Sequence, residues 1–284
     1  MPDFDLIDQS SPLHQSANFL DEQSLHSVHL CRVSLAPVTE VECVQLIADA
    51  IDTGCGGWCV TVNLENLRKT AANPELQRLV ESSTLRVADG ITLVWASWLR
   101  GVPLPERVCG SNLIYSLTDE AAKRGLSVFL LGGNEGTADR AAEILRQRNR
   151  GLKIAGTLCP PVGFERDLEQ VEKILEILRR AQPDIIYVAV GFPKSERLIA
   201  RIRHVCPNAW WLGVGISFSY VTQDIKRPPR WAQNLGFETL YRLLQEPQRL
   251  ARRYLLDGPP FAAKLLLLSL VQRFTDQIAA SNRR

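Results

Sequence analysis

Two short polar motifs, each directly after a predicted buried strand, are the first candidates for chemistry. Asn63 follows the apolar run 58–62, and Asp89-Gly90 follows the run 84–88. In an open α/β sheet, ligands bind at the carboxyl ends of the strands, where the next helix presents free N–H groups. Asn and Asp are also favoured helix N-caps, so the sequence leaves both interpretations open.

A catalytic base in this chain is expected to be a carboxylate. Three of the four histidines lie at or before the first predicted strand, and His204 lies at the end of a predicted helix. This arrangement argues against hydrolysis by a Ser-His-Asp or Cys-His site and against histidine-based zinc catalysis. Asp89 is the best placed carboxylate. The candidates behind it are Glu65, Glu106 and Glu196.

Three glycine-rich turns close further predicted strands. They are Leu131-Gly132-Gly133-Asn134, Gly191-Phe192-Pro193-Lys194 and Gly213-Val214-Gly215. None matches G-x-G-x-x-G or the P-loop, so a tight strand-to-helix turn explains any one of them as well as a ligand does. Together they favour a nucleotide-type ligand at the edge of the sheet.

Alternating strand and helix patterns must position these residues. Predicted strands are the runs 28–35, 58–62, 84–88, 127–131, 153–157, 185–190 and 209–214, and predicted helices are 40–51, 74–81, 111–124, 138–148, 165–181 and 194–204. Continuous apolar strands are typical of sheets covered by helices on both faces. The sequence therefore predicts an α/β fold: a Rossmann-like, mostly parallel sheet with helices on both faces, plus a C-terminal helical appendage.

The chain divides into three parts by composition. Residues 1–26 are polar and aperiodic and are predicted to be a disordered extension. Residues 27–230 form the predicted Rossmann-like domain, and 231–284 form a basic helical appendage. The segment 216–231 lacks either periodicity and is expected to be a loop. Helices are predicted in the appendage at 236–246, 247–256 and 261–279.

Charge separates the appendage from the body. The chain has 284 residues, 45% of them hydrophobic, which suits one large α/β domain. From Lys226 to Arg284 there are 11 Lys or Arg residues against 4 acids, whereas the preceding 225 residues carry 22 against 27. A basic tail on an acidic body indicates an anionic surface or a phosphate-rich ligand as its partner.

Neither a disulfide framework nor a metal site is expected. The seven cysteines are spread from Cys31 to Cys206 without a C-x-x-C pair, which is typical of reduced core residues. Paired aspartates can hold a divalent metal in sugar-nucleotide enzymes, but Asp3-Phe4-Asp5 lies outside any predicted strand. No signal-peptide pattern opens the chain. We expect a cytosolic enzyme.

The motifs, taken in order, resemble the WecG/TagA/CpsF glycosyltransferases, family 26 of the glycosyltransferases. The resemblance runs from about Arg32 to Phe274, over most of the chain. The matching motifs are TVNLENL at 61–67, ADG at 88–90, RVCG at 107–110, FLLGG at 129–133, GFPKSE at 191–196, GVG at 213–215 and YRLLQEPQRLARRY at 241–254. An ordered set of this kind is far more specific than any one motif.

The resemblance implies a metal-independent, inverting transfer from a UDP-sugar to a polyprenyl-diphosphate-linked sugar in bacterial cell-surface polysaccharide synthesis. The sugar would be of the N-acetylmannosamine type, the glucose type or a related type. No cofactor and no nucleic-acid partner is implied. Guanidinium groups can neutralise the charge that develops on a departing UDP, which makes a metal unnecessary.

The resemblance also implies roles for individual residues. Asp89 matches the family's proposed general base, with Thr61 and Asn63 as polar residues beside it and Arg107 as an arginine lining the pocket. In the tail, three arginines match residues thought to close over the donor diphosphate. The implied substrate-binding residues are Gly132, Gly133, Lys194, Ser195, Glu196, Gly213, Gly215, Arg242, Arg249 and Arg252.

Four departures from the family pattern concern specificity. Ser195 replaces the glutamine of P-K-Q-E and Ser219 replaces an aspartate, while 227–229 reads R-P-P in place of R-A-P and 238–239 reads E-T in place of E-W. Because the catalytic residues remain, altered donor specificity is favoured over lost activity. The alternatives are a non-catalytic paralogue that acts as a binding or assembly partner, and a nucleotide-dependent oxidoreductase, against which the missing G-x-G-x-x-G argues.

The last predicted helix carries an apolar face. Its members at helical spacing are Ala263, Leu267, Leu270, Val271, Phe274 and Ile278. The apolar run 265–271 is too short to span a bilayer, so we expect the helix to lie on an anionic membrane surface. The enzyme would then be cytoplasmic and peripheral on the inner face of the cell membrane. The alternative is that the face packs against the protein's own core or a sister subunit in a homo-oligomer.

Overall fold

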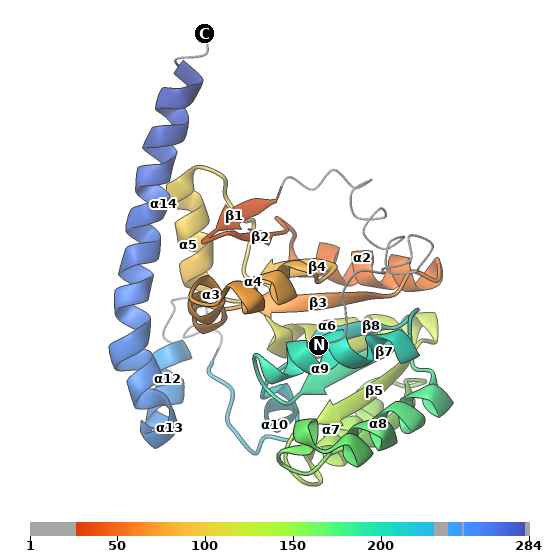
Figure 1. Cartoon of the computed structure of the whole chain (residues 1–284). Coiled ribbons are helices and arrows are strands. Elements are labelled where there is room, and N and C mark those ends of the chain that lie inside the picture. Colours follow the sequence, from red (N-terminus) through yellow and green to blue (C-terminus); the bar gives the residue numbers. More distant parts are fainter. Residues whose placement is uncertain (1–26, 230–237, 246, 282–284) are drawn as a thin grey trace.

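A six-stranded parallel sheet forms the centre of the computed structural model, which describes residues 27–229, 238–245 and 247–281 (Figure 1). The strand order is β4-β3-β8-β7-β5-β6, and every neighbouring pair is parallel. The strands are β3 (Gly57–Val62), β4 (Leu85–Ala88), β5 (Ser127–Gly132), β6 (Lys153–Leu158), β7 (Ile185–Ala189) and β8 (Trp210–Gly213). The predicted Rossmann-like α/β fold is confirmed.

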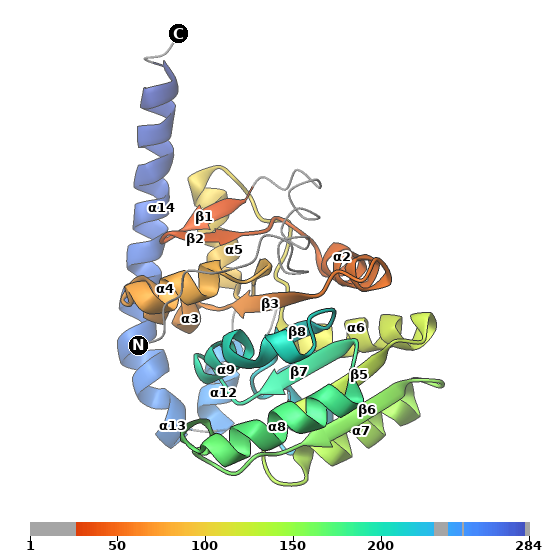
Figure 2. The same ribbon diagram turned by 45° about the vertical axis from the view of Figure 1, so that its right-hand side comes forward.

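Helices cover both faces of this sheet, as predicted. One face carries α3 (Leu64–Ala71), α4 (Pro74–Glu81), α5 (Ile91–Arg100), α8 (Leu168–Ala181) and α9 (Lys194–Ile202). The other face carries α2 (Glu40–Asp52), α6 (Gly110–Arg124), α7 (Thr137–Arg148) and α10 (Ser217–Val221). Figure 2 shows α8 and α9 in front of the strands.

The two hydrophobic cores explain why the strands are continuously apolar. Side chains alternate between the faces of a strand. Trp211 therefore packs into the core under α8 and α9, whereas its neighbour Trp210 packs into the core under α2 and α6. Both tryptophans are fully buried. Since neither face of the sheet meets water, the residues that point to either face are apolar.

Local signals set the helix boundaries. Thr39 and Glu42 form a capping box at the start of α2, and Asn73 caps α4, which begins with a proline. Asp167 accepts hydrogen bonds from two backbone N–H groups and so caps α8. The predicted helix 165–181 therefore begins at Leu168, and η1 (Phe164–Arg166) is a separate 3₁₀ turn before it.

The structure corrects two predicted elements. The run 28–35 is a hairpin of β1 (Val28–Leu30) and β2 (Val33–Leu35) in a sheet of its own, because Cys31 and Arg32 both have positive φ and turn the chain. The segment 216–231, predicted as a loop, contains the helix α10. Helices α3 and α5, for which no bounds were predicted, begin directly after Asn63 and Gly90.

The C-terminal region is helical, as predicted. It consists of α12 (Glu238–Gln245), α13 (Pro247–Ala251), the π-helical segment η3 (Arg252–Asp257) and α14 (Gly258–Ser281). Helix α14 lies along α5 and extends beyond it (Figure 1). The boundary drawn at 230/231 falls in residues outside the described part, as does the extension 1–26, so the domain division stays a prediction.

Helix α14 is longer than the apolar run 265–271, from which we predicted that the helix is too short to span a bilayer. The helical stretch Leu255–Ile278 has 24 residues and a mean hydropathy of 1.2, so by length and composition alone it could cross a membrane. One side of α14 is nevertheless part of the protein core. Leu265 packs into the cluster under α3 and α5, and Ser269 is buried.

Candidate active site

A cavity of about 280 Å³ lies at the carboxyl ends of β3, β4 and β8. Parallel strands place their carboxyl ends along one edge, so residues distant in sequence meet there. The residues named as candidates that line it are Thr61, Asn63, Glu65, Asp89, Ser195, Glu196, Gly213 and Gly215. Lining residues that had not been singled out include Asn66, Lys69, Ser111 and Tyr220.

The structure separates the two interpretations of the polar strand ends. Asn63 is a helix cap: its Oδ1 accepts a hydrogen bond from the Asn66 backbone N–H at 3.0 Å. Asp89 is not, because the N-cap of α5 is Gly90, without a side-chain cap. The backbone N–H of Asp89 donates to the Val62 carbonyl at 2.8 Å, which ties the end of β4 to β3. Asp89 therefore lines the cavity without being the N-cap of α5.

Glu196 is a buried carboxylate in the same cavity. Its side chain is 4% exposed, and Oε2 has no hydrogen-bond partner among the described residues. Burial raises the carboxyl pKa to about 7. Near neutral pH the Glu196 carboxyl group can therefore donate a hydrogen bond to a ligand when it is protonated, or accept one when it is ionised. Gly213 makes room for it, since a Cβ at that position would lie 2.8 Å from Glu196 Oε1.

Ser195 lies beside Glu196 at the start of α9. The side chain is buried, and its hydroxyl donates to the Val188 carbonyl at 3.4 Å. A glutamine here would reach further into the cavity than serine does. The replacement of glutamine by serine therefore changes the space that is available to a ligand at this wall of the cavity. Ser219, the other replacement, lines a neighbouring cavity.

That neighbouring cavity, of about 490 Å³, lies at the ends of β5 and β7. It is lined by the predicted residues Gly132, Gly133, Lys194 and Gly215. Gly191, Gly215 and Ile216 line both cavities, so the two are contiguous. Lys194 Nζ lies 2.6 Å from Glu165 Oε1, and this cation lowers the pKa of the Glu165 carboxyl. A cation is thus held beside the glycine turns.

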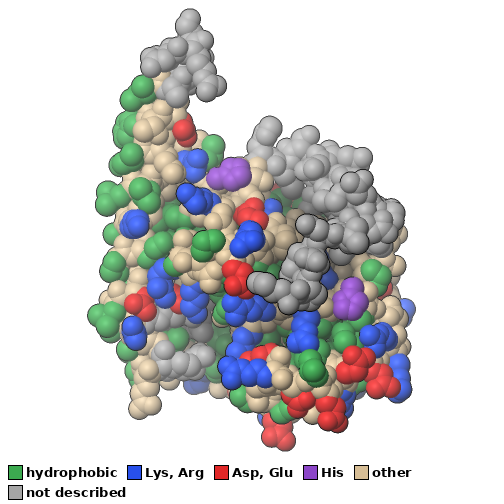
Figure 3. Space-filling view, viewed as in Figure 1, with side chains coloured by type: hydrophobic (Ala, Val, Ile, Leu, Met, Phe, Trp, Pro, Cys, Tyr) green, Lys and Arg blue, Asp and Glu red, His purple; other side chains and the backbone are tan. Residues whose placement is uncertain are grey.

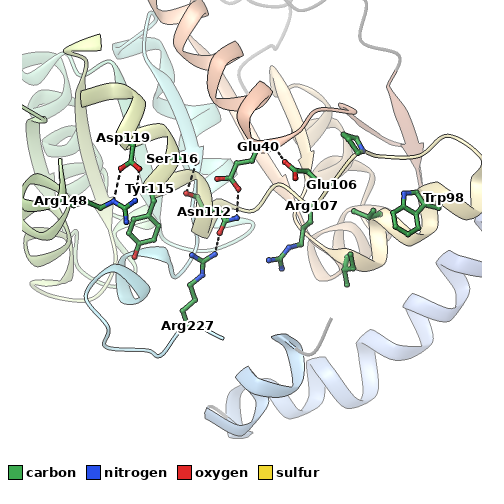
Figure 4. A pocket seen from close by; sticks show the side chains of 13 residues that line it. Glu40, Trp98, Glu106, Arg107, Asn112, Tyr115, Ser116, Asp119, Arg148 and Arg227 are labelled. Carbon is green, nitrogen blue, oxygen red and sulfur yellow. Dashed lines mark hydrogen bonds and ion pairs between the residues drawn. The ribbon is translucent and has the colours of Figure 1, made fainter. Parts of the chain in front are cut away.

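A third cavity, of about 830 Å³, is larger than these two and lies between α2, α5 and α6 (Figure 4). Arg107 lines this cavity and not the one that contains Asp89. Arg227 reaches it from residues 226–229 and donates to Asn112 Oδ1 and, at 3.3 Å, to Ser111 Oγ. Arg227 had been noted only as part of a departure from the family pattern. In the sequence, the one feature that could have indicated a role for Arg227 is an arginine directly before two prolines.

Of the three tail arginines named as candidates, only Arg252 has a side chain that the structure describes. Arg242 and Arg249 fall in α12 and α13, but their side chains lie outside the described part. Arg252 in η3 is exposed, lies 4.0 Å from Asp257 and lines none of the three cavities. Within the described residues, no group of three or more His, Cys, Asp or Glu side chains is clustered as a metal site would need.

Comparison with known proteins agrees with the fold and the motifs. N-acetylglucosaminyldiphosphoundecaprenol N-acetyl-beta-D-mannosaminyltransferase of Bacillus spizizenii is 30% identical over 236 residues, which cover 82% of this chain and 89% of that protein. The sequence model of the glycosyl transferase WecG/TagA/CpsF family matches residues 28–275. This range confirms the resemblance, and the chain belongs to the WecG/TagA/CpsF family of glycosyltransferases.

Proposed function

We propose that this glycosyltransferase moves a sugar from a UDP-sugar to a polyprenyl-diphosphate-linked sugar, with inversion and with Asp89 as the general base. The observation that carries the proposal is the position of Asp89: at the end of β4, not capping α5, and in one cavity with Thr61 and Asn63. The name of the Bacillus spizizenii relative supports a lipid-linked acceptor and a sugar of the N-acetylmannosamine type. A glucose-type or related sugar is the alternative donor.

The chemical step needs a base on the face of the sugar opposite the departing UDP. Asp89 takes the proton of the acceptor hydroxyl, the acceptor oxygen bonds to the anomeric carbon, and the bond from that carbon to the UDP oxygen breaks. The electron pair leaves with UDP. In this proposal Lys194, which lines a cavity with Gly132 and Gly133, meets the diphosphate charge without a metal.

Residues 231–284 supply the remaining part of the proposed mechanism. Closure of this appendage would bring Arg242, Arg249 and Arg252 over the donor diphosphate. A mobile closing element is consistent with the exposure of Arg252 in the described structure. Excluding water at closure strengthens the arginine contacts with the phosphates and protects the donor from hydrolysis.

Release of UDP tests the proposed reaction. Full-length protein is incubated with UDP-N-acetylmannosamine or UDP-glucose and a synthetic short-chain N-acetylglucosaminyl diphospholipid, and UDP is measured with and without the acceptor. Acceptor-dependent release with either donor supports the proposal. Ser195 and Ser219 make a non-catalytic paralogue the specific rival, and it would bind UDP but release none from these or related UDP-sugars.

We also propose that α14 places the enzyme on an anionic membrane surface. Leu267, Val271, Phe274 and Ile278 are between 56% and 64% exposed on one side of α14. Figure 3 shows hydrophobic side chains along this outer edge. The surrounding tail has an excess of seven positive charges, each worth on the order of 1 kcal/mol near an anionic leaflet. Because the opposite side of α14 packs on α5, lipid cannot surround the helix, which favours a surface position.

Vesicle sedimentation tests the membrane proposal. Leu267→Glu with Leu270→Glu should reduce binding to vesicles of anionic lipid while sparing transfer to a short-chain, water-soluble acceptor. Leu168→Glu is the matched control, because Leu168 is exposed on α8, away from α14, and lines none of the three cavities. If the double variant changes its oligomeric state and still binds vesicles, the face is a subunit interface and the membrane proposal fails.

A further inference from the structure

A second carboxyl group lines the cavity that contains Asp89, and the reaction steps given so far do not use it. Glu196 is 4% exposed, and its Oε2 has no hydrogen-bond partner among the described residues. Leaving a buried polar atom without a partner costs free energy, and a ligand that supplies a partner removes this cost. The Glu196 carboxyl group therefore has a hydrogen bond to offer to a ligand in this cavity.

Glu196 is also the carboxyl group of the cavity that keeps its proton near neutral pH. Burial raises its pKa to about 7, and a hydrogen bond from its own backbone N–H opposes that rise. Glu65, in the same cavity, instead pairs with Arg68 at 2.9 Å and lies 3.4 Å from Lys69. The remaining titratable side chains that line the cavity are Asp89 and Tyr220. Glu196 can thus donate a proton at a pH at which an ordinary carboxyl group has lost it.

Two glycines connect the surroundings of Glu196 and Asp89. A Cβ at Gly213 would lie 2.8 Å from Glu196 Oε1, and a Cβ at Gly110 would lie 3.6 Å from the Gly213 carbonyl oxygen. Next to Gly110, burial and then the charge of Asp89 raise the pKa of the Cys109 thiol. The two carboxyl groups therefore belong to one space, and no side chain of these two glycines fills it.

The sheet sets the separation of the two groups. Asp89 follows β4 and Gly213 ends β8, with β3 between them, so these strands are about 10 Å apart across the sheet. In inverting glycosidases the acidic and the basic carboxyl groups are roughly 6.5–9.5 Å apart, which leaves room for the nucleophile and the anomeric carbon. A pair in which one carboxyl gives a proton and the other takes one is compatible with the proposed inversion.

Glu196 lies toward the side of the cavity where the diphosphate is proposed to bind. Lys194, two residues earlier in α9, lines the contiguous cavity with Gly132 and Gly133. A diphosphate beside Lys194 and an acceptor hydroxyl beside Asp89 place the breaking bond between these two positions. Along the edge of the sheet, that is the region of β8 and of the start of α9, which carries Glu196.

We propose that Glu196 is a second catalytic residue, a general acid that gives its proton to the β-phosphate oxygen of UDP as that oxygen leaves the anomeric carbon. The inference rests on the proposed function. Asp89 takes the proton of the acceptor hydroxyl, the bond to the acceptor oxygen forms, and the electron pair of the breaking bond goes to the UDP oxygen, which takes the Glu196 proton. Afterwards Asp89 loses its proton to water and Glu196 regains one. Protonation neutralises charge on the leaving group, which a bound metal ion does in other enzymes.

Proton uptake on UDP binding tests the contact without turnover. The charge of a diphosphate beside Glu196 raises the pKa of this carboxyl further, so at pH 8 the native protein should take up about 0.5 to 1 proton for each UDP bound. The terminal phosphate of UDP contributes little, because its second pKa is about 6. Calorimetry of the full chain in buffers with different enthalpies of ionisation measures this number. Glu196→Gln should take up almost none, and Glu172→Gln, an exposed site on α8, should match the native protein.

The pH dependence of kcat tests the acid role itself. A general acid must be protonated, so kcat of the native protein should fall as the pH rises through the pKa of Glu196 in the donor complex. At pH 7 the Glu196→Gln variant should turn over about 100-fold more slowly, and its kcat should not fall further on the alkaline side. A residue with only a structural role would lower kcat equally at every pH.

The outcomes distinguish this inference from the proposed function. If UDP binding takes up no proton, or if Glu196→Gln takes up as many as the native protein, Glu196 does not contact the diphosphate and the inference fails. If uptake depends on Glu196 but no donor releases UDP, the contact stands and the proposed transfer fails. If transfer occurs and the alkaline fall persists in Glu196→Gln, Glu196 is not the acid. Should Glu196→Gln not fold, Glu196→Asp replaces it, and its shorter side chain should reduce the proton uptake.

Discussion

Replacing Glu196 by glutamine should remove a pH dependence from the stability of this protein. Burial raises the pKa of the Glu196 carboxyl from 4.5 to about 7, so folding favours its protonated form. The stabilisation from this group is complete below about pH 4.5, the unfolded value, and is lost as the pH rises through about 7. At 1.36 kcal/mol for each tenfold change in proton affinity, the whole loss is about 3 kcal/mol.

Urea unfolding at pH 5 and pH 8 measures this loss. Between pH 5 and pH 8 the native protein should lose about 2 to 3 kcal/mol in free energy of unfolding through the ionisation of Glu196. The Glu196→Gln variant should not show this loss, because an amide does not ionise. Glu172→Gln, at an exposed position, is the matched control for the loss of one carboxylate. If the difference between native protein and Glu196→Gln is the same at both pH values, Glu196 does not titrate as a buried group and the reasoning is wrong.

Two further predictions concern the same cavity and the metal. Gly213→Ala places a Cβ 2.8 Å from Glu196 Oε1, so the free energy of unfolding should fall by about 1–3 kcal/mol, and unchanged urea unfolding would contradict the close packing. Transfer should survive both EDTA and deletion of residues 1–26, because arginine and lysine meet the diphosphate charge in the proposed mechanism. Loss of UDP release on chelation, with recovery on adding magnesium or manganese, would refute metal independence.

The sheet and the strand-end residues could be predicted because they depend on local sequence. Apolar runs such as 185–190 belong to strands buried on both faces, and the carboxyl ends of parallel strands meet at one edge. The rule therefore placed Asn63 and Asp89 together from separate motifs. It could not tell which of them caps a helix, because that depends on whether Asp89 or Gly90 occupies the N-cap.

The remaining features depend on tertiary contacts. Arg227 and Arg107 are distant in sequence and line one cavity only because residues 226–229 fold back onto the start of α6. The raised pKa of Glu196 comes from burial by segments that the P-K-S-E motif does not contain. The turn at Cys31 and Arg32 divides an apparently single strand, since neither residue type ordinarily favours positive φ.

The most direct test of the central claim is UDP release by Asp89→Asn, with the donor that the native protein accepts. Asparagine keeps the size of the side chain but cannot take the acceptor proton, so turnover should fall by about two to four orders of magnitude. Glu65→Gln is the matched control, because Glu65 lines the same cavity but pairs with Arg68 at 2.9 Å, and its loss should be much smaller. Undiminished acceptor-dependent turnover in folded Asp89→Asn protein would contradict the assignment of Asp89 as the base.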